Sequence, residues 1–446
     1  MTIQLPEKVQ YIIEELEKEG YEAYAVGGCV RDSLLGRVPS DWDITTSAKP
    51  QQVKAVFRKT VDTGIQHGTV TVMLEREGFE VTTYRIDGEY EDNRHPKEVI
   101  FTSDLVEDLK RRDFTINAMA YNPRTGLVDA FEGMEDMKNR RIRCVGNAKE
   151  RFSEDALRIL RAVRFAAQLE FGIDEDTRTA MKELAGNLSN ISAERIQTEL
   201  IKLLVSKQPQ RLKEAYELGI TKVILPEFDA IMNCTQNNIH HCYTVGEHTL
   251  ESLRQIEQDK VLRLAVLFHD FGKPKTKTVD EQQTEHFHGQ AMESAKMAET
   301  IMKRLKFDNN TLDKVVTLVE LHDHRPSLKK KSVKKLIVKS GTELFLPLIK
   351  VKYADTLAQS MYQREEKLAY LEQLQEIYHT ILEEKECISL KDLAVNGKDM
   401  IDLGVPQGKR IGEILKELFE LVLEQPEKNN REELLRLVKE DIKSKD

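Results

Sequence analysis

The sequence lacks the features that mark membrane, secreted and zinc-ribbon proteins. No apolar run in its 446 residues approaches the roughly 18–20 residues that a bilayer-spanning helix needs. The first residues, MTIQLPEKVQ, have neither the basic start nor the apolar core of a signal peptide. The five cysteines are scattered and form no CxxC pair, which favours reduced thiols over a zinc ribbon. These absences predict a cytoplasmic protein without a membrane partner.

An excess of positive charge is missing as well. The formal net charge is −9 and the isoelectric point is about 5.8, a balance that does not by itself indicate a nucleic-acid-binding protein. Phosphates are met locally, however, and three basic clusters are present: KRRDF at 110–114, KNRRIR at 138–143 and KKKSVKK at 329–335. Each cluster either contacts phosphates or forms an ordinary solvated face, and composition does not decide between these interpretations.

The chain is organised as a mixed α/β region followed by helices. A length of 446 residues predicts two to four domains. AYAVGG and DWDITT have the pattern of buried strands, while GTVTVML and GFEVTTYR alternate as paired strands do. From residue 147 onward the pattern is almost wholly helical, without internal repeats or low-complexity linkers. The predicted domains are an α+β head (1–146), a helical neck (147–230), a second helical domain (231–360) and a helical tail (361–446).

A glycine pair in the head is a candidate phosphate-binding turn. In VGGCVRD, residues 26–32, Gly27 and Gly28 stand between a predicted strand and a predicted helix. Glycine lets the backbone approach a ligand closely, and the start of a helix offers free N–H groups to an anion. Arg31 adds a forked donor suited to phosphate. By itself such a glycine pair is usually only a turn.

Two aspartates follow in DWDITT. Alternation along a strand puts Asp41 and Asp43 on one face and Trp42 on the other. Two like charges so close together are costly without cations. Two Mg²⁺ ions about 3.5–4 Å apart are the natural counter-charge and serve in-line phosphoryl or nucleotidyl displacement. The alternative is an exposed pair of aspartates at the end of a strand.

These motifs, taken together, resemble a known family. GGxVRD followed by DxD is similar to the signature of the polymerase-β-like nucleotidyltransferases. RRDFTINAMA at 111–120 and EDALRILRAVRFA from residue 154 narrow the resemblance to the class II tRNA nucleotidyltransferases (CCA-adding enzymes) and the bacterial poly(A) polymerases. The match covers roughly the first 230 residues, with several independent motifs in the expected order. It implies a polymerase-β-like head followed by an all-α neck.

The resemblance also implies roles for residues of the head. Asp41 and Asp43 are expected to hold two Mg²⁺ ions and to activate the 3′-hydroxyl of an RNA primer. Sites of this type usually recruit a third carboxylate from a neighbouring strand, for which Glu80 is the candidate. The residues expected to bind the nucleotide are Gly28 and Arg31, which contact the incoming triphosphate, and Arg112 and Asp113, which contact its phosphate and sugar.

The segment EDALRILRAVRFAAQL, residues 154–169, has the pattern of a single half-buried helix. Its structural interpretation is a solvated basic face held by i,i+3 and i,i+4 ion pairs. The resemblance implies instead a protein template, in which Asp155 and Arg158, oriented by Glu154, pair with the Watson–Crick edge of C or A. G and U present the opposite order of donor and acceptor, which would leave buried polar groups unpaired at a cost of about 1–3 kcal/mol each.

Further segments complete this prediction. Arg161 and Arg164 are expected to brace the template pair or to reach the triphosphate. The segment 85–102 resembles the family's flexible loop that helps to switch specificity from C to A. SAERIQTEL at 192–200 resembles a neck motif that supports the template helix, with Ser192 as its N-cap, and Arg195 and Glu199 beyond it, in a structural role.

The predicted function is therefore Mg²⁺-dependent addition of CCA to tRNA from CTP and ATP. Two alternatives within the family are an A-adding enzyme and a poly(A) polymerase, whose template residues look alike. An alternative of another class is a non-catalytic RNA-binding head joined to a catalytic second domain.

Histidine is concentrated in one part of the second domain. Eight of the eleven histidines lie between residues 240 and 324. VLRLAVLF carries His269 and Asp270 to the end of an apolar helix, which Gly272 and Pro274 terminate. A buried helix end with this pair, and further histidines on other helices, suits a divalent ion bound by imidazole and carboxylate.

This pattern is similar to the HD phosphohydrolase superfamily, whose members hydrolyse phosphomonoesters or phosphodiesters with a metal-activated water. By position, the resemblance implies a set of ligands for a first divalent metal of unknown identity: His248, His269, Asp270 and Asp355. His288 and His322 match the additional histidines of two-metal members. A damaged tRNA 3′ end that carries a cyclic phosphate is a natural substrate for such a site. The alternative is a degenerate scaffold without activity.

Overall fold

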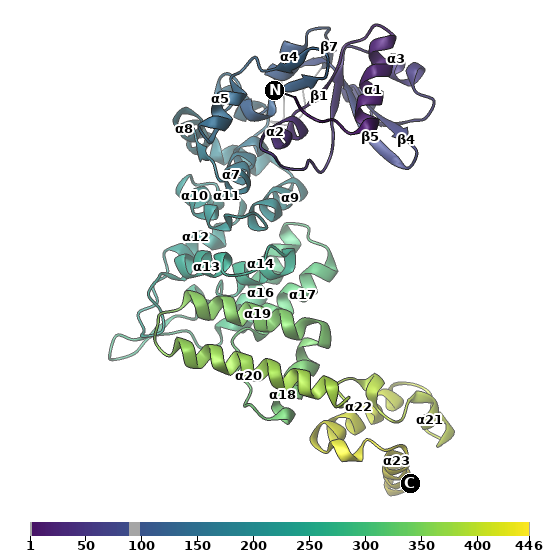
Figure 1. Ribbon diagram of the computed structural model, residues 1–446. Helices are drawn as coiled ribbons and strands as arrows, with labels where there is room; N and C mark the ends of the chain where they lie inside the picture. Colours follow the sequence, from purple (N-terminus) through teal and green to yellow (C-terminus); the bar gives the residue numbers. More distant parts are fainter. Residues whose placement is uncertain (1, 89–98, 446) are drawn as a thin grey trace. The chain divides into compact units, whose positions relative to one another are not determined.

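The computed structural model describes residues 2–88 and 99–445. The chain divides into two compact units, residues 1–229 and 230–446 (Figure 1). Each unit is described by itself below. Of the predicted flexible loop 85–102, residues 89–98 lie outside the described residues.

The first unit is built on a seven-stranded sheet in the order β3-β4-β5-β2-β1-β8-β9. Only β2 and β5 pair in parallel within it. The strands are β1 (Ala23–Val26), β2 (Ile44–Thr46), β3 (Thr60–Gly64), β4 (Thr69–Leu74), β5 (Glu77–Thr83), β8 (Ala120–Asn122) and β9 (Gly126–Val128). The predicted pairing of GTVTVML with GFEVTTYR is confirmed, because β4 and β5 are antiparallel neighbours. A short hairpin of β6 (Arg85–Asp87) and β7 (Val99–Phe101) lies apart from the sheet.

The prediction that DWDITT is entirely strand is wrong at its start. Strand β2 begins at Ile44, and Asp41 and Asp43 precede it in irregular backbone. Aspartate is a poor strand former and two neighbouring carboxylates repel each other, so the ladder starts only at the apolar and β-branched residues that follow. Trp42 still packs, half-buried, against the core.

Short helices cover the sheet and frame its central strands. The core beneath α1 joins the helix to the sheet through Val9, Ile12, Ile13, Ile44 and Val81. The glycine pair stands, as predicted, at the junction of β1 and the helix α2: Gly27 lies between them and Gly28 is the first residue of α2. The helical elements of the head are α1 (Glu7–Lys18), α2 (Gly28–Leu34), α3 (Pro50–Val56), η1 (Ile65–His67), α4 (Leu105–Lys110), η2 (Thr115–Asn117) and α5 (Gly133–Lys138).

The rest of the first unit is helical, as predicted. A two-stranded parallel pair, β10 (Arg141–Ile142) and β11 (Gly172–Ile173), flanks its start. The helices are α6 (Ala148–Glu154), α7 (Leu157–Leu169), α8 (Glu175–Leu184), η3 (Ala185–Asn190), α9 (Ala193–Leu204), η4 (Pro209–Arg211), α10 (Leu212–Glu217), α11 (Thr221–Ile224) and α12 (Pro226–Met232).

The predicted single helix over 154–169 is wrong, because two helices share this segment. Helix α6 ends at Glu154, Asp155 has extended backbone (φ −140°, ψ 101°), and α7 begins at Leu157. The Asp155 carboxylate accepts a hydrogen bond from the Leu157 N–H (3.1 Å). Asp155 thus satisfies an exposed donor at the start of α7, which is how aspartate begins a helix rather than continuing one.

The second unit is a bundle of helices with one small hairpin, β12 (Thr278–Val279) and β13 (Glu285–His286). Helices α13, α14, α17 and α19 pack on one another, and α18 and α20 pack against α19. The helices are α13 (Val245–Arg254), α14 (Lys260–Phe268), α15 (Lys273–Thr276), α16 (Gln290–Arg304), α17 (Asn309–Leu321), α18 (Lys330–Ser340), α19 (Thr342–Ala358), α20 (Arg364–Glu383), η5 (Leu390–Asp392), α21 (Gly397–Asp402), α22 (Lys409–Glu424), η6 (Pro426–Lys428) and α23 (Arg431–Lys445). The last helices have their own core, which includes Met400, Phe419 and Leu434.

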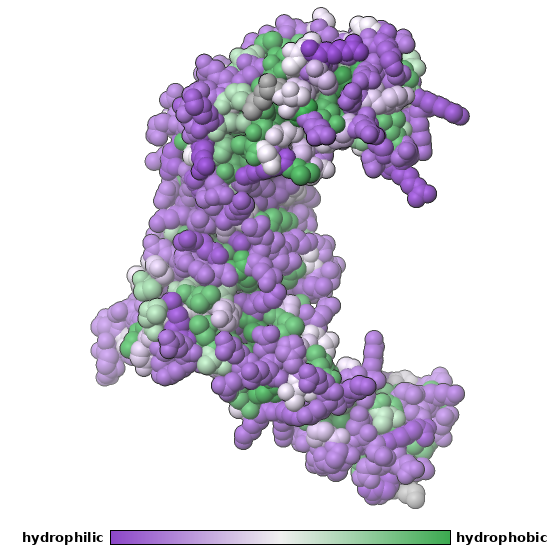
Figure 2. All heavy atoms as spheres, in the orientation of Figure 1, coloured by the Kyte–Doolittle hydropathy of each residue, from purple (hydrophilic) through white to green (hydrophobic). Residues whose placement is uncertain are grey.

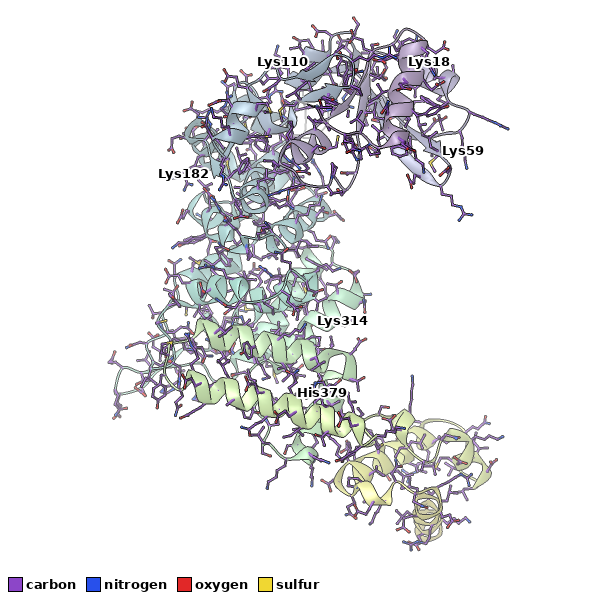
Figure 3. All side chains as sticks on the ribbon, viewed as in Figure 1. Lys18, Lys59, Lys110, Lys182, Lys314 and His379 are labelled. Carbon is purple, nitrogen blue, oxygen red and sulfur yellow. The ribbon has the colours of Figure 1, made fainter. Side chains whose placement is uncertain are left out.

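Polar side chains dominate the face of the molecule shown in Figure 2. The exposed side chains of Lys18, Lys59, Lys110 and Lys182 extend outward in Figure 3. Over the described residues, every helix is too short or too polar to cross a membrane.

Candidate functional site

The three carboxylates predicted to hold metal lie along one cavity of the head. Asp41, Asp43 and Glu80 line a cavity of about 910 Å³, to which Glu7 and Glu77 also contribute. Glu80 lies on β5. This strand pairs with β2, which begins directly after Asp43. Partial burial and the neighbouring charges of Asp41 and Glu80 raise the pKa of Asp43 above its usual value. Such mutual repulsion makes the cluster a receptor for hard divalent cations, which prefer oxygen ligands.

An arginine side chain packs closely on the glycine turn. Gly27 has φ +82°, and a Cβ atom there would lie 2.8 Å from Nη1 of Arg112. Only glycine allows both this backbone conformation and this approach. Burial lowers the pKa of the Arg112 guanidinium. The negative charges of Asp108, whose Oδ2 lies 3.7 Å from Arg112 Nη2, and of Asp43 oppose this shift without cancelling it. The turn therefore places a buried guanidinium beside the carboxylate cluster.

Arg31 is buried and its fork is fully engaged. Nε and Nη2 donate to Asp32 (2.9 Å each), and Nη1 donates to the Asn117 side-chain oxygen (2.5 Å). The Asn117 amide also donates to Asp113 (3.1 Å). Arg31, the predicted triphosphate ligand, and Asp113, predicted with Arg112 to contact the phosphate and sugar, are thus joined through Asn117, to which no role was assigned from the sequence.

Asp113 of the head is hydrogen-bonded to a side chain of helix α7. Its carboxylate accepts hydrogen bonds from Nε and Nη2 of Arg161 (2.9 and 2.6 Å). Burial raises the pKa of Asp113, but the charges of Arg161 and the hydrogen bond from Asn117 hold it well below the usual range. Arg161 on α7 therefore holds the Asp113 carboxylate in place.

The two residues of the predicted template pair have different partners in the structure. Asp155 accepts hydrogen bonds from both terminal nitrogens of Arg195 (2.7 and 3.3 Å), on α9. Arg158 donates to Glu154 (2.7 Å) and to the Arg111 carbonyl (2.9 Å). Asp155 lies in the break between α6 and α7, so the two residues do not stand on one face of a single helix.

The arginines of α7 face inward. Arg158 and Arg164 are 8% and 7% exposed, which excludes the interpretation of a solvated basic face. Three guanidinium groups surround the Phe165 ring, those of Arg164 at 3.8 Å, Arg31 at 5.1 Å and Arg161 at 5.5 Å from its centroid. Burial lowers the pKa of Arg164 to about 10. Cationic groups so placed are held by the π face of the ring.

Helix α9 supplies the carboxylate that balances these charges. Glu199 is 4% exposed and pairs with Arg164 (2.5 Å) and Arg161 (3.8 Å). Arg195, one turn earlier on the same helix, binds Asp155. Ser192 occupies the N-cap position of α9, but its side chain makes no capping hydrogen bond. The resemblance of SAERIQTEL to a supporting neck motif was the sequence signal for this contact.

The basic clusters are largely neutralised within the fold. Arg111 and Arg112 pair with Asp108, and Arg141 and Arg143 pair with Asp136. In the third cluster, four lysines pair with carboxylates of later helices and loops, namely Lys330 with Glu384, Lys331 and Lys335 with Glu424, and Lys334 with Glu386. This pairing favours structural roles for these clusters.

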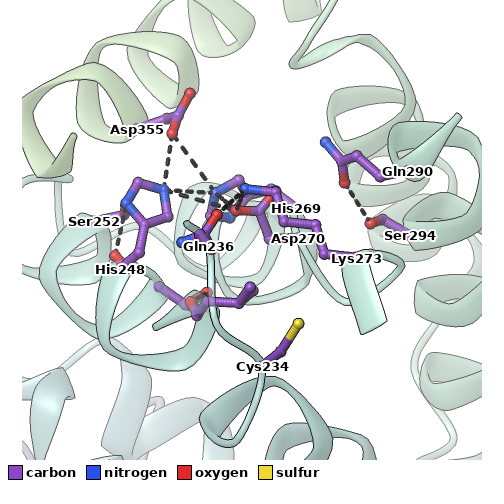
Figure 4. A network of polar contacts seen from close by, with 12 residues as sticks. Cys234, Gln236, His248, Ser252, His269, Asp270, Lys273, Gln290, Ser294 and Asp355 are labelled. Atoms are coloured by element: carbon purple, nitrogen blue, oxygen red, sulfur yellow. Dashed lines mark hydrogen bonds and ion pairs between the residues drawn. The ribbon is translucent and has the colours of Figure 1, made fainter. Parts of the chain in front are cut away.

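The second unit brings together the histidines and aspartates predicted as metal ligands (Figure 4). His248 comes from α13, His269 and Asp270 follow α14, and Asp355 comes from α19. The Nε2 atoms of His248 and His269 lie 3.3 Å apart. His248 Nε2 is 2.9 Å from Asp355 Oδ1, and His269 Nε2 is 3.2 Å from Asp270 Oδ2.

Backbone carbonyls near the Nδ1 atoms fix the orientation of the His248 and His269 rings. Nδ1 of His269 lies 2.7 Å from the Val266 carbonyl, and Nδ1 of His248 lies 3.3 Å from the Ala358 carbonyl. A proton on each Nδ1 leaves both Nε2 lone pairs directed at the same point. Two nitrogen ligands about 2.0–2.1 Å from a metal are roughly 3.0–3.4 Å apart when adjacent, so the observed spacing suits a divalent ion.

Of the two carboxylates of this centre, that of Asp270 is buried and that of Asp355 is half-buried. Asp270 is 1% exposed. Its Oδ2 atom forms an ion pair with Lys273 (2.7 Å), but no hydrogen bond to this atom is found among the described residues. Burial opposes ionisation, but His269 and Lys273 hold the pKa of Asp270 well below its usual range. The pKa of Asp355 is likewise held low by His248, despite burial.

The two additional histidines are placed differently. Nε2 of His322 lies 3.8 Å from Asp270 Oδ1 and 3.0 Å from the Gln290 amide nitrogen. His288 stacks on His286 with ring centroids 5.7 Å apart. Both His322 and His288 line a cavity of about 900 Å³ that Asp270 and Asp355 also line, but only His322 lies near the ligand cluster.

Three family models match successive parts of the chain. A model of the "Poly A polymerase head domain" matches residues 23–143, and one described as "Probable RNA and SrmB-binding site of polymerase A" matches 170–232. A third, for domain 2 of tRNA nucleotidyltransferases, matches 281–438. These models follow one another along the chain and span both units.

Individual proteins are similar to the chain over different lengths. The CCA-adding enzyme of Leuconostoc mesenteroides is 51% identical over 214 residues, 47% of this chain and 53% of that protein. That of Enterococcus faecalis is 51% identical over 199 residues, 45% of this chain and 49% of that protein. The chain thus matches about half the length of these curated relatives.

Similarity to a solved structure extends further. The crystal structure of the Bacillus stearothermophilus CCA-adding enzyme in complex with CTP is 30% identical, with a TM-score of 0.73, and the match covers 98% of this chain and 97% of that one. The Thermotoga maritima CCA-adding enzyme complexed with tRNA, at 22% identity and a TM-score of 0.55, shares the fold.

Proposed function

Because the chain belongs to the family of the CCA-adding enzymes, we propose that it adds the 3′-terminal CCA to tRNA from CTP and ATP. The observation that carries this proposal is the cluster of Asp41, Asp43 and Glu80 around one cavity beside the glycine turn. The B. stearothermophilus relative binds CTP, and the T. maritima relative binds tRNA. In the reaction, the primer 3′-hydroxyl attacks the α-phosphate of the nucleotide and pyrophosphate leaves.

The carboxylate cluster has the donor set for divalent metal. Asp41, Asp43 and Glu80 would hold Mg²⁺, which supplies neutralisation of the triphosphate and a lowered pKa of the attacking hydroxyl. The raised pKa of Asp43 fits oxygen ligands that lack their counter-charge. Arg112, which packs closely on Gly27 and interacts electrostatically with Asp43, provides donors for phosphate oxygens.

Base selection is assigned to Asp155 and Arg158. A carboxylate accepts from the amino group of C or A, and a guanidinium donates to the adjacent ring nitrogen. In the structure these groups are bound to Arg195 and Glu154, so a nucleotide base has to replace or share those partners. Arg161 and Arg164 hold Asp113 and Glu199 and thereby keep α7 in place against the head.

A stepwise extension assay tests this function. A tRNA that ends before the first C is incubated with CTP alone, and ATP is added afterwards. We expect two C residues to be added first and one A after them. Absence of C addition would favour the A-adding alternative, and long A tails would favour a poly(A) polymerase.

We also propose that the second unit carries an HD-type metal centre that hydrolyses phosphoesters. Its support is the convergence of His248, His269 and Asp270 at separations suited to one metal ion. Asp355 adjoins this group, with Oδ1 2.9 Å from His248 Nε2. A divalent metal there would supply an activated water. His322 beside Asp270 is placed to join a second metal, whereas His288 is more remote. A tRNA 3′ end with a cyclic phosphate remains the proposed substrate.

Metal analysis tests this centre without relying on activity. The purified chain is dialysed against Mn²⁺ and its metal content is compared with that of His269→Ala. We expect the substitution to remove the metal bound by the second unit and any hydrolysis of a 2′,3′-cyclic phosphate, while CCA addition continues. Hydrolysis that persists after His269→Ala and metal removal would contradict the assignment.

A further inference from the structure

A second, smaller cavity adjoins the proposed metal centre. Its volume is about 250 Å³, and it shares His240, His322, Asp323 and Asp355 with the 900 Å³ cavity. The remaining wall comes from α19, from the start of α20 and from the segment after α17. The cavity therefore reaches two of the proposed metal ligands from a different part of the bundle.

Three cationic side chains line this small cavity. They are Arg325, in the segment after α17, Lys352 on α19 and Lys367 on α20. Among the described residues, none of the three has a carboxylate oxygen within ion-pair distance. Three carboxylates, those of Asp323, Asp355 and Glu366, also line the cavity, yet each stands beyond that distance from the three cations. The lysines of α18, by contrast, are paired with the carboxylates of Glu384, Glu386 and Glu424.

The two lysines are held in place by uncharged partners. Nζ of Lys352 donates to the backbone carbonyls of His322 (2.5 Å) and His324 (2.7 Å), and its side chain is 5% exposed. Nζ of Lys367 donates to the Gln359 side-chain oxygen (2.7 Å). Burial, together with the positive charge of Arg325, lowers the pKa of Lys367 below its usual value. Carbonyl and amide oxygens orient an ammonium group but leave its charge uncompensated.

We propose that the cavity lined by Arg325, Lys352 and Lys367 binds a phosphoryl group. An anion there would form the direct ion pairs with these cations that the carboxylates of the cavity wall do not form. A volume of about 250 Å³ is below the range of about 300–1,000 Å³ that is typical of drug-sized ligands. It suits a phosphate or a sugar phosphate rather than a whole oligonucleotide.

This assignment deepens the proposed phosphohydrolase function and rests on it. A phosphate held beside Asp355 and His322 lies next to the group that the metal centre would hydrolyse. The centre would then act on a substrate that carries two phosphoryl groups, as a nucleotide chain with a phosphorylated end does. The same cations can alternatively hold the free phosphate that hydrolysis releases, and the binding experiment separates these two sources.

Binding is measured by calorimetry on the full chain, with inorganic phosphate, AMP and adenosine as probes. Measurements in EDTA suppress metal-dependent binding of nucleotides in the head, and parallel measurements contain Mn²⁺. We expect Arg325→Gln and Lys367→Gln each to weaken the binding of inorganic phosphate or of AMP roughly tenfold, because each removes one charge-assisted contact. Arg325→Lys keeps the charge and should retain most of the affinity.

Lys350→Gln is the matched control. Lys350 lies on the same helix as Lys352 but pairs with Glu257 (2.7 Å) outside the cavity. It removes the same charge from the chain, so unchanged affinity in this variant shows that the effect is local. Thermal unfolding of each variant checks that the fold is retained.

The outcomes distinguish the alternatives. AMP binding more tightly than inorganic phosphate, with both dependent on Arg325 and Lys367, indicates a nucleotide phosphate, and equal binding indicates released phosphate. Affinities that do not change in either glutamine variant, or adenosine binding that these variants abolish, would overturn the proposal. His269→Ala reports on the metal centre separately, because it should lower metal content without changing phosphate binding in EDTA.

Discussion

The two units each hold a cluster of carboxylates, but they differ in what balances the negative charge. The carboxylates of the head lie along an open cavity, and partial burial together with mutual repulsion raises the pKa of Asp43. In the second unit, Asp270 is buried and Asp355 is half-buried, but His248, His269 and Lys273 hold their pKa values low. The head cluster therefore depends on added cations for its counter-charge, whereas the buried centre contains its own. This difference predicts opposite responses to mutation, metal and pH.

The largest effect is expected for the head. Asp41→Ala removes one of three clustered oxygen ligands, and we expect CCA addition to fall by roughly 10³-fold or more, since each such loss removes several kcal/mol of transition-state stabilisation. The measurement is single-turnover extension of a CCA-less tRNA with CTP. Metal content of the second unit should stay unchanged. Extension at the wild-type rate would refute the assignment of the carboxylate cluster.

The next effect concerns stability of the buried centre. Asp270→Asn leaves the buried ammonium of Lys273 (6% exposed) without its carboxylate partner. Removing one member of a buried pair costs about 3–5 kcal/mol, and we expect a loss of the order of 3 kcal/mol in the free energy of unfolding. Urea denaturation in EDTA measures it. Asp280→Asn, at an exposed pair with His286 (2.8 Å), is the control and should change little.

The pH dependence of this centre has a definite sign. The folded-state pKa values of Asp270 and Asp355 are lower than the usual values of the unfolded chain. Their stabilising contribution is therefore present above the unfolded pKa near 4 and is lost progressively as pH falls below it. Asp270→Asn should accordingly flatten the acid side of the stability profile.

A smaller effect is expected on base selection. Asp155→Ala removes the acceptor for the amino group of C or A and leaves Arg195 without that partner. We expect discrimination against UTP and GTP, measured as ratios of kcat/KM, to fall about tenfold to a hundredfold, which corresponds to about 1–3 kcal/mol. Arg195→Ala tests whether Arg195 only holds Asp155 in place, in which case selectivity falls less. Unchanged ratios in Asp155→Ala would contradict the template role.

Local patterns in the sequence predicted much of this structure. Alternation identified β4 and β5, the glycine pair marked the junction of β1 and α2, and the end of an apolar helix located His269 and Asp270. Each of these depends on interactions within a few residues, which sequence periodicity records directly. The third carboxylate, Glu80, lies in the cavity where the first two lie.

Tertiary contacts decided what the sequence could not predict. The break at Asp155 has no glycine or proline to announce it, and its partner Arg195 lies forty positions away in the sequence. The lysines of α18 have the pattern of a basic surface until Glu384, Glu386 and Glu424 are placed beside them. Pairing between distant residues leaves no periodic signal, so a charge run and a neutralised charge run look identical in sequence.

The smallest expected effect has the sign opposite to that at Asp270. The raised pKa of Asp43 means that its ionised form is less favoured in the folded chain than in the unfolded one. Ionisation of Asp43 as pH rises through this pKa therefore lowers stability when metal is absent. In EDTA, Asp43→Asn should raise the free energy of unfolding slightly, by no more than about 0.5 kcal/mol because the side chain is exposed and screened. Mg²⁺ should stabilise the wild type and not the variant, and a loss of stability in EDTA on substitution would show that Asp43 is not repelled by its neighbours.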